Sequence, residues 1–522
     1  MPTRVKTVHA VVAVLSPYLK VIWRSHLSHR SWRALYVALG LMAILIRPYF
    51  VVPRNLRHLP KVSTVEWFLS VLRGESSDVR SERLVLPLIQ KHGLCLKYMI
   101  GRWTVTVGDP VLLQAMLKDV ETFPKAQHIN LDPDLILTNK EANMGNANNL
   151  DWRRQRRVAN PIFHRALPVE TFGQIASRMF AAMVAYGNNG IIDAADFMKR
   201  YALDCLGLGV FDFDMGAVSD PSSPYAVLYK DAFNILRDPL VYLFPAYTSI
   251  PSRYIPYRNK SRLANDELRR ILYDIVEEKK RSLEHNQIPD QKKDLLTLMI
   301  EASKAENEDK YLTNGELVAN LSVFFVAGHE TTASATASTL YYLAAHPEIQ
   351  ERARSEVISV LGDDPEDILP TQEQLRKMPY LNNCIKEAMR INPPTSGNLP
   401  RLCVRDTYLG NHFIPKGTTL AMELYSLHHL PKYWKDPDTY NPDRFIQIDN
   451  NYWMPFGYGP RACIGMNFSL AEQRVVQAMM LRKFTWKLAP NSEHADGLKN
   501  AKSGGITLLG PLQLHLQLTK RY

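Results

Sequence analysis

One cysteine, Cys463, lies in a glycine-rich run near the C-terminus, Phe456-Gly-Tyr-Gly-Pro-Arg-Ala-Cys-Ile-Gly465. Glycines have no Cβ, so this backbone can bend tightly and lie flat against a large group. A helical pattern follows from Asn467. Because the unpaired N–H groups at the start of a helix favour a thiolate over a thiol, the stretch predicts a reactive or metal-binding sulfur.

Four uses of such a sulfur can be compared. Zinc takes several Cys or His ligands at close spacing, and none lies near Cys463. A nucleophile needs a base, and no neighbouring His can be placed. An inert buried cysteine is the ordinary case, but the surrounding Gly-x-Arg-x-Cys-x-Gly pattern argues against it. Haem iron accepts a single axial cysteine thiolate, and Arg461 could then pair with a haem propionate.

A second chemical motif, Ala327-Gly-His-Glu-Thr-Thr332, follows an apolar stretch in a helix predicted over 317–343. Gly328 weakens the helix by about 1 kcal/mol relative to Ala. Thr331 can bond to the carbonyl four residues earlier, and such bonds bend helices. Glu330 beside Thr331 makes an acid–alcohol pair suited to proton delivery. The alternative is an ordinary core contact with a solvated glutamate.

Two weaker patterns accompany these motifs. Trp152 and Arg156 are four apart and share one face of a helix that Asp151 can cap. Glu387 and Arg390 share a face in the same way at a spacing of three. Such pairs are common on protein surfaces, where they contribute little.

Together, five motifs resemble those of the cytochrome P-450 family and occur in the family's order over roughly 55–522. The resemblance implies haem b with Cys463 as the axial metal ligand. It also implies that Thr331 and Glu330 are catalytic. Further residues would contact the cofactor: Phe456, Gly465 and Ala327 beside the ring, and Trp152, Arg156, Arg401 and Arg461 at the propionates. Glu387, Arg390 and Arg444 would form a buried structural network that locks the haem loop.

Charge is distributed unevenly along the 522 residues, whose net charge is +11. Residues 1–61 hold ten Lys or Arg and no acid, which leaves 53 basic and 52 acidic residues in the rest of the chain. The basicity therefore points to a membrane surface rather than to nucleic acid. Five scattered cysteines imply no disulfide framework and favour a reducing compartment.

An apolar run over 34–52, interrupted by Arg47 and Pro48, is long enough to span a bilayer as a helix. We therefore expect a membrane anchor in 1–53 and a catalytic domain in 54–522. A buried core helix is the alternative, and the weaker run Val11–Trp23 is a possible second segment. By resemblance to microsomal members of the family, the anchor would be single-pass in the endoplasmic reticulum, with the catalytic domain facing the cytosol.

The expected fold is mainly helical with small β-sheets (α+β). Leu94–Ile100 and Trp103–Val107 read as a hairpin, and Asp109-Pro110 opens a helix. The irregular stretch 121–150 is long enough to be functional. By resemblance it lines the substrate pocket, together with 222–250 and 394–400.

The resemblance implies a monooxygenase that inserts one atom of O2 into a lipophilic substrate by hydroxylation or epoxidation. The chain has no G-x-G-x-x-G phosphate loop, so electrons would come from NADPH through NADPH–cytochrome P-450 reductase, with cytochrome b5 optional. Arg153, Arg154 and Arg157 are candidates for docking that partner. Two alternatives stay open: a reductase-independent haem-thiolate isomerase or peroxygenase, and a non-catalytic haem-binding protein.

Overall fold

The structure is a computed structural model of the chain. It describes residues 36, 47–127, 135, 141–164, 167–186, 190–285, 288–289, 293–304, 311–447, 450–502 and 508–522. The chain divides into two compact units, Met1–Pro53 and Arg54–Tyr522. Most of the predicted anchor and all of Val11–Trp23 lie outside the described residues. Among the residues described, no helix combines the length and the apolar character that crossing a membrane requires.

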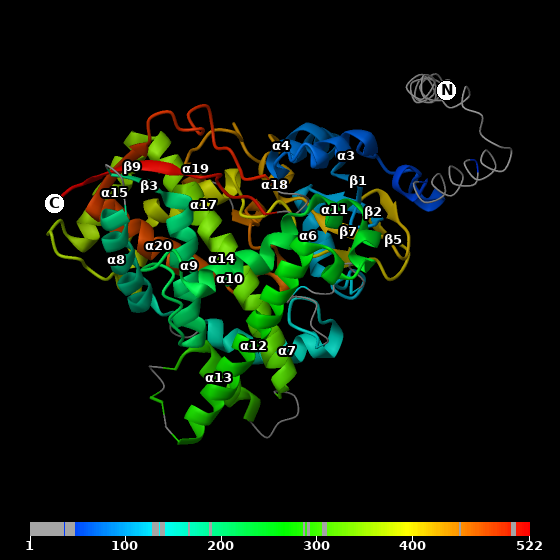
Figure 1. Cartoon of the computed structure of the whole chain (residues 1–522). Helices are drawn as coiled ribbons and strands as arrows, with labels where there is room; N and C mark the ends of the chain where they lie inside the picture. Colours follow the sequence, from blue (N-terminus) through cyan, green and yellow to red (C-terminus); the bar gives the residue numbers. More distant parts are fainter. Residues whose placement is uncertain are drawn as a thin grey trace, which may run out of the picture. The chain divides into compact units, whose positions relative to one another are not determined.

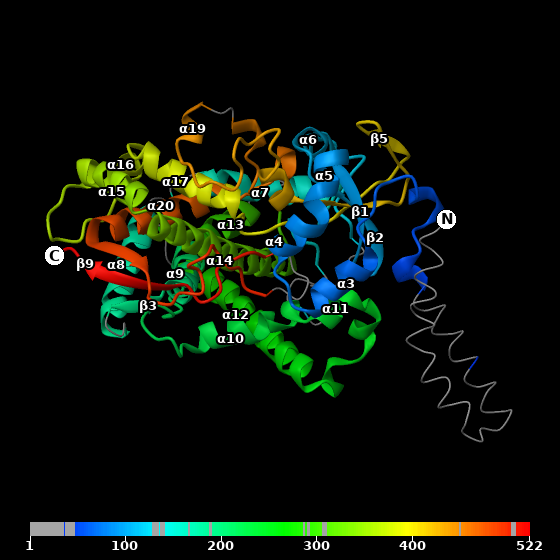
Figure 2. The same ribbon diagram turned by 90° about the horizontal axis from the view of Figure 1, so that it is seen from above.

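Helices dominate the larger unit, as the sequence predicts (Figures 1 and 2). The helices of the first half are α3 Thr64–Leu72, α4 Ser77–Arg80, α5 Leu86–His92, α6 Pro110–Lys118, α7 Asn149–His164, α8 Val169–Tyr186, α9 Ala194–Leu206, α10 Pro224–Phe233, α11 Pro239–Leu243 and α12 Pro256–His285. Those of the second half are α13 Leu295–Lys304, α14 Asn314–Ala345, α15 Pro347–Leu361, α16 Gln372–Arg376, α17 Pro379–Ile391, α18 Leu424–His428, α19 Arg444–Gln447 and α20 Met466–Lys483.

Three small sheets complete the unit. The largest has the order β1-β2-β7-β4, built from Leu94–Met99, Arg102–Val107, Thr419–Met422 and Arg401–Leu402. A second has the order β3-β9-β8, from Ile191–Asp193, His515–Lys520 and Phe484–Leu488. The pair β5 Thr407–Leu409 and β6 His412–Ile414 forms the third. In both views the sheet containing β1 and β2 and the sheet containing β3 and β9 lie at opposite ends of this unit (Figures 1 and 2).

The hairpin between β1 and β2 turns one residue earlier than the sequence predicts. Ile100 and Gly101 occupy the turn with φ of 47° and 79°, and Arg102 begins the second strand. Positive φ at both central positions is the signature of the type I′ turn, whose twist matches that of the flanking strands. The predicted strand Leu94–Ile100 therefore ends at Met99, because Ile100 is needed for the turn.

Of two aspartates predicted to cap helices, one does so and one does not. Asp109 caps α6, accepting bonds from the N–H groups of Val111 and Leu112 at 2.9 and 3.2 Å. Asp151 does not cap α7, because that helix already begins at Asn149. Asp151 therefore lies in the first turn, where a carboxylate still faces the positive end of the helix dipole.

The 32-residue helix α14 runs through the middle of the unit and packs against α9, α12, α17 and α20 (Figure 2). The prediction over 317–343 is confirmed, with a few more residues at each end. The helix starts at a capping box in which Thr313 Oγ1 accepts from the Glu316 N–H at 3.1 Å and the Glu316 side chain accepts from the Thr313 N–H at 3.0 Å. Buried residues lie on all its faces, as expected of a core helix.

The buried side chains of α14 fall into two groups. Those from Leu317 to Phe325 join a core cluster with α7, α10, α12 and α13. Those from Ala333 to Ala344 join another with α8, α9, α17 and α20. Between the two groups, Ala327 is exposed and Thr331 is half-buried. The centre of this core helix therefore presents open surface where the acid–alcohol motif lies.

Candidate active site

The cysteine loop is a tight turn that leads into α20. The Cys463 N–H donates to the Phe456 carbonyl at 2.9 Å, which closes the loop on itself. Gly457 and Gly459 have φ of +74° and +72°, a conformation that side chains rarely adopt. A Cβ on Gly459 would lie 3.1 Å from the Leu117 carbonyl oxygen, so this glycine also allows the loop to approach α6.

Cys463 differs from the other cysteines of the chain. It is exposed, whereas the remaining four are buried. Its sulfur is accessible yet surrounded by protein, and this burial raises the pKa of the Cys463 thiol. The Gly465 N–H and the Arg156 cation act in the lowering direction and are outweighed. The prediction that the start of α20 favours a thiolate stays a prediction, and a bound metal ion would act in the same direction as the Gly465 N–H and Arg156.

The exposed segment of α14 around Ala327 is held in place by contacts on its buried side. His329 is buried, its Nε2 lies 2.8 Å from the Lys199 carbonyl oxygen, and burial lowers its pKa to about 4. A Cβ on Gly328 would lie 3.0 Å from the Leu206 side chain. On the open side, Thr331 Oγ1 donates to the Ala327 carbonyl at 2.6 Å, the back-bond expected from the sequence.

Three predicted arginines lie in a cation cluster. Arg461 donates to the carbonyls of Met144 and Ala147 and lies 3.9 Å above the Trp152 ring. Arg156 donates to the Ala462 carbonyl at 3.0 Å, and Arg401 to the Phe123 carbonyl at 3.0 Å. Burial, together with the neighbouring arginines, lowers the pKa of Arg461 to about 9.

A fourth cation, Lys125, was not anticipated. It is 8% exposed, its Nζ donates to the Leu399 carbonyl at 3.3 Å, and it faces Arg401 across an antiparallel bridge. Burial, and then Arg401 and Arg461, hold the pKa of Lys125 well below its usual range. Like charges placed opposite each other are destabilising. No spacing within 121–150 marks this lysine, because only the long-range pairing with Arg401 brings it to the cluster.

Within the described part of the chain, no carboxylate forms an ion pair with any member of this cluster, which consists of Lys125, Arg156, Arg401 and Arg461. The Nε atoms of Arg156 and Arg461 are buried and lack a partner. Buried charges are ordinarily paired. The arrangement therefore fits an anionic group with more than one carboxylate, such as a haem.

Arg154 has a different place from the one predicted. Its guanidinium binds both carboxylate oxygens of Glu316, at the start of α14, and these bonds raise its pKa. It ties α7 to α14, and its side chain is half-buried. Arg153 remains at the surface, with Glu121 at 3.6 Å.

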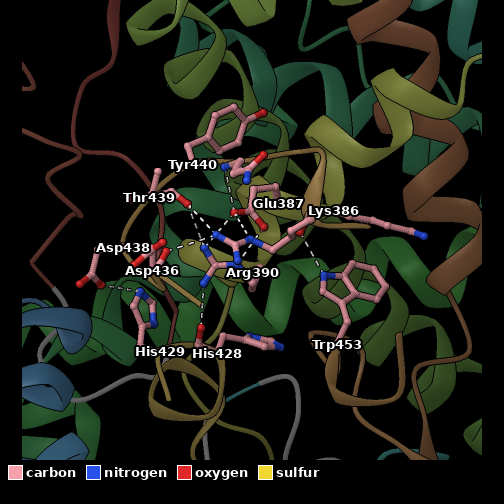
Figure 3. A network of polar contacts seen from close by, with 12 residues as sticks. Lys386, Glu387, Arg390, His428, His429, Asp436, Asp438, Thr439, Tyr440 and Trp453 are labelled. Carbon is pink, nitrogen blue, oxygen red and sulfur yellow. Dashed lines mark hydrogen bonds and ion pairs between the residues drawn. The ribbon is translucent and has the colours of Figure 1, made fainter. Parts of the chain in front are cut away.

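Glu387 and Arg390 lie together at the C-terminal end of α17 (Figure 3), and Arg444 joins them in a buried network. Arg390 donates to both Glu387 oxygens at 2.8 and 2.9 Å, and Arg444 Nε donates to Oε1 at 2.8 Å. The remaining guanidinium N–H groups donate to backbone carbonyls, including that of His428 at 2.8 Å. The carboxylate is thus paired with two cations.

This network reaches the segment that leads into the cysteine loop. The Met454 N–H donates to His428 Nε2 at 3.1 Å. Trp453 Nε1 donates to the Lys386 carbonyl at 3.0 Å, a bond seen in Figure 3. Trp453 and Met454 are separated from Phe456 by Pro455 alone. The network and the loop are therefore joined through α17 and α18.

Residues 67–514 match the sequence profile of the family described as Cytochrome P450. This chain belongs to the cytochrome P450 family. It is accordingly a haem-thiolate monooxygenase that carries haem b. Among its relatives are cytochrome P450 3A5 of Homo sapiens, 31% identical over 65% of this chain and 68% of that protein, and cytochrome P450 3A13 of Mus musculus, 30% identical over 70% and 73%.

A plant relative, echinocystic acid 23-monooxygenase of Saponaria officinalis, is 27% identical over 83% of this chain and 87% of its own length. Among solved structures, the heme domain of cytochrome P450DA superposes with a TM-score of 0.74 at 23% identity, covering 89% of this chain and 98% of that one. At this identity the likeness shows the fold. The P450 fold, with its long central helix and small sheets, is thereby confirmed.

We predict that Glu387→Gln destabilises this P450 by about 3 kcal/mol or more, because removing one member of a buried ion pair leaves uncompensated charge. The measurement is the denaturation midpoint of the holoprotein. Glu373→Gln is the control, since it breaks an exposed pair with Lys377 on α16 and should leave the midpoint unchanged. Equal midpoints for the two variants would contradict a stabilising role for the network.

Proposed function

We propose that Cys463 is the axial haem ligand of a monooxygenase that hydroxylates or epoxidises a lipophilic substrate with electrons from NADPH. The observation that supports this most strongly is the pairing of an accessible sulfur with uncompensated cations. The sulfur has a raised pKa, and among the described residues no carboxylate pairs with any of the four cations. A haem would bring an iron cation to the first and two propionates to the second.

In this proposal Lys125 joins Arg156, Arg401 and Arg461 as a propionate-binding cation. Trp152 keeps the Arg461 guanidinium in place by stacking against it at 3.9 Å. Gly465 keeps the space beside the sulfur clear, because the nearest atom to a Cβ added there is Cys463 Sγ at 3.9 Å. Phe456 and Ala327 form walls on the cysteine side and on the α14 side.

When bound, the haem iron supplies the centre at which O2 is reduced and one oxygen atom is passed to the substrate. Thr331 and Glu330 manage the protons that this reduction consumes. Thr331 Oγ1 directs its own proton to the Ala327 carbonyl, so its lone pairs are available to accept a proton from water or from the Glu330 carboxyl. Glu330 is half-buried and can therefore exchange protons with solvent.

The wall of the proposed substrate pocket includes aliphatic side chains. A Cβ on Gly145 would lie 3.1 Å from Asn143 Oδ1, 3.7 Å from Val323 on α14 and 3.8 Å from Leu399. Three segments that are distant in sequence, within 121–150, 394–400 and α14, therefore meet at this point. Aliphatic side chains at that junction support a lipophilic substrate such as a steroid, terpenoid, fatty acid or xenobiotic.

Electrons would reach this site from a separate flavoprotein, NADPH–cytochrome P450 reductase, with cytochrome b5 as an optional donor. Exposed cations near the cysteine loop support docking of an acidic partner there. Arg153 lies on α7, and Lys118 ends α6 with its ammonium 5.5 Å from the Tyr458 ring. Tyr458 is itself part of the cysteine loop.

We also propose that residues 1–53 anchor the protein in the endoplasmic reticulum membrane and that 54–522 face the cytosol. The basic composition of the first 61 residues supports this. A second support is an exposed apolar patch in the larger unit. The α3 side chains Val65, Leu69 and Leu72 are exposed there, as are Leu240 and Phe244, and Phe244 packs against Phe68 of α3.

We predict that the expressed chain remains with microsomes after extraction at alkaline pH, because an inserted apolar helix is held by the hydrocarbon rather than by charge. The fraction is measured by sedimentation and immunoblotting. A peripheral protein bound through its basic residues would be released. Release of this chain into the supernatant would rule out the anchor.

For the axial ligand, Cys463→Ser should abolish the absorption band of the reduced carbon monoxide complex that marks cysteine-thiolate ligation. Cys403→Ser is the matched control: it replaces another thiol, whose sulfur donates to the Arg405 carbonyl at 2.9 Å, a bond that serine can also make. The control should keep the band. A Cys463→Ser protein that retained it would have a different ligand.

For the proton relay, Thr331→Ala should lower product formed per NADPH at least about tenfold, since positioned acid–base groups contribute that much or more. The reduced oxygen would leave as hydrogen peroxide. Thr331→Ser keeps the hydroxyl and should stay coupled. Tight coupling in the alanine variant would remove the relay, and a wild-type protein that ignores NADPH and reductase would favour a peroxide-using or non-catalytic haem protein.

A further inference from the structure

A chain of polar groups joins the helix that carries the proton relay to the helix that follows the cysteine. Thr332 Oγ1 on α14 lies 2.9 Å from Ser469 Oγ on α20. Gln473 Nε2, one turn further along α20, donates to the same Ser469 oxygen at 3.2 Å. Thr332 and Gln473 are buried. The Ser469 hydroxyl is therefore held between the two helices.

This contact lies close to the proposed functional residue of each helix. Thr332 directly follows Thr331. Ser469 is in the first turn of α20, where its N–H donates to the Gly465 carbonyl at 2.9 Å, and Gly465 is two residues after Cys463. A single serine thus bonds through its backbone to the end of the cysteine loop and through its side chain to the neighbour of the relay threonine.

The local helix needs such an external bond. Gly328 is a poor helix former, and the Thr331 back-bond to Ala327 uses a carbonyl of the helical ladder. The α14 helix is continuous here, but these two features lower its intrinsic stability over that one turn. Successive helical residues point about 100° apart, given 3.6 residues per turn. Fixing Thr332 against α20 therefore fixes the direction in which Thr331 points.

We propose that Ser469 is a positioning residue whose hydroxyl bond to Thr332 sets the rotation of α14 at Thr331 and thereby controls how much of the reduced oxygen reaches product. The inference rests on the proposed monooxygenase function. It adds a residue outside the pocket to the control of coupling between electron use and product. In this proposal Ser469 contacts neither the substrate nor the protons that are delivered to oxygen.

The structure provides a matched control for this proposal. Gln477 Nε2 donates to the Thr336 carbonyl at 3.0 Å. This bond joins the same two helices, but it lies one turn of α14 further along the chain from Thr331. Gln477 is also fully buried. Removing this bond should weaken the packing of α14 on α20 without changing the direction of Thr331.

The experiment compares Ser469→Ala, Ser469→Thr, Thr332→Val and Gln477→Met in the full chain. Each variant is assayed with reductase and with a lipophilic substrate that the wild-type protein converts to product. Product, hydrogen peroxide and NADPH consumed are measured, together with the melting temperature and the carbon monoxide band. Ser469→Ala and Thr332→Val should each lower product per NADPH about threefold or more, because small misplacements of reacting groups are costly. Their carbon monoxide bands should stay intact.

Ser469→Thr should restore coupling, and the double variant Ser469→Ala/Thr332→Val should be no worse than either single one. Gln477→Met should melt earlier while remaining coupled. The proposal is overturned if Ser469→Ala stays coupled while Thr331→Ala does not, or if Gln477→Met uncouples as strongly as Ser469→Ala. Failure of Thr331→Ala to uncouple would instead count against the proposed relay.

Discussion

The site depends on four cations, two buried and two half-buried, that pair with no carboxylate in the described part of the chain. Lys125, Arg156, Arg401 and Arg461 come from the 121–150 stretch, α7, β4 and the cysteine loop. Each donates to a backbone carbonyl, which satisfies part of its hydrogen-bonding capacity but does not neutralise its positive charge. Uncompensated charge away from water is costly. The fold that gathers these residues is therefore completed by a ligand that carries carboxylates.

The buried network around Glu387 differs from this cluster, because its charges are paired. Glu387 lies between Arg390 and Arg444, and the spare guanidinium groups bind carbonyls, so that network needs no further partner. It can therefore lock the segment before the cysteine loop whether or not a cofactor is bound. At Cys463 the surroundings raise the pKa of the thiol, and an added cation would act in the opposite direction. In the proposed assignment, haem would bring an iron cation to the sulfur and propionates to the four cations.

Sequence motifs predict much of this arrangement, since they encode local geometry. Gly459 is needed for a positive φ beside α6, Thr331 bonds to its own helix, and Glu387 and Arg390 are one turn apart. The misses depend on long-range pairing. Lys125 reaches the cluster only through its bridge to Arg401. Arg154 forms an ion pair with Glu316, which is 162 residues away in the sequence. The pKa of Cys463 depends on packing that no local pattern records.

The most direct measurement compares haem with its dimethyl ester in binding to apoprotein produced under iron limitation. Both carry the same iron and ring, and only the carboxylates differ. If the cation cluster holds the propionates, the ester should bind at least about thirtyfold more weakly, since truncating one partner of a buried charge pair costs about 2 kcal/mol or more. Equal affinity for the two compounds would contradict the account.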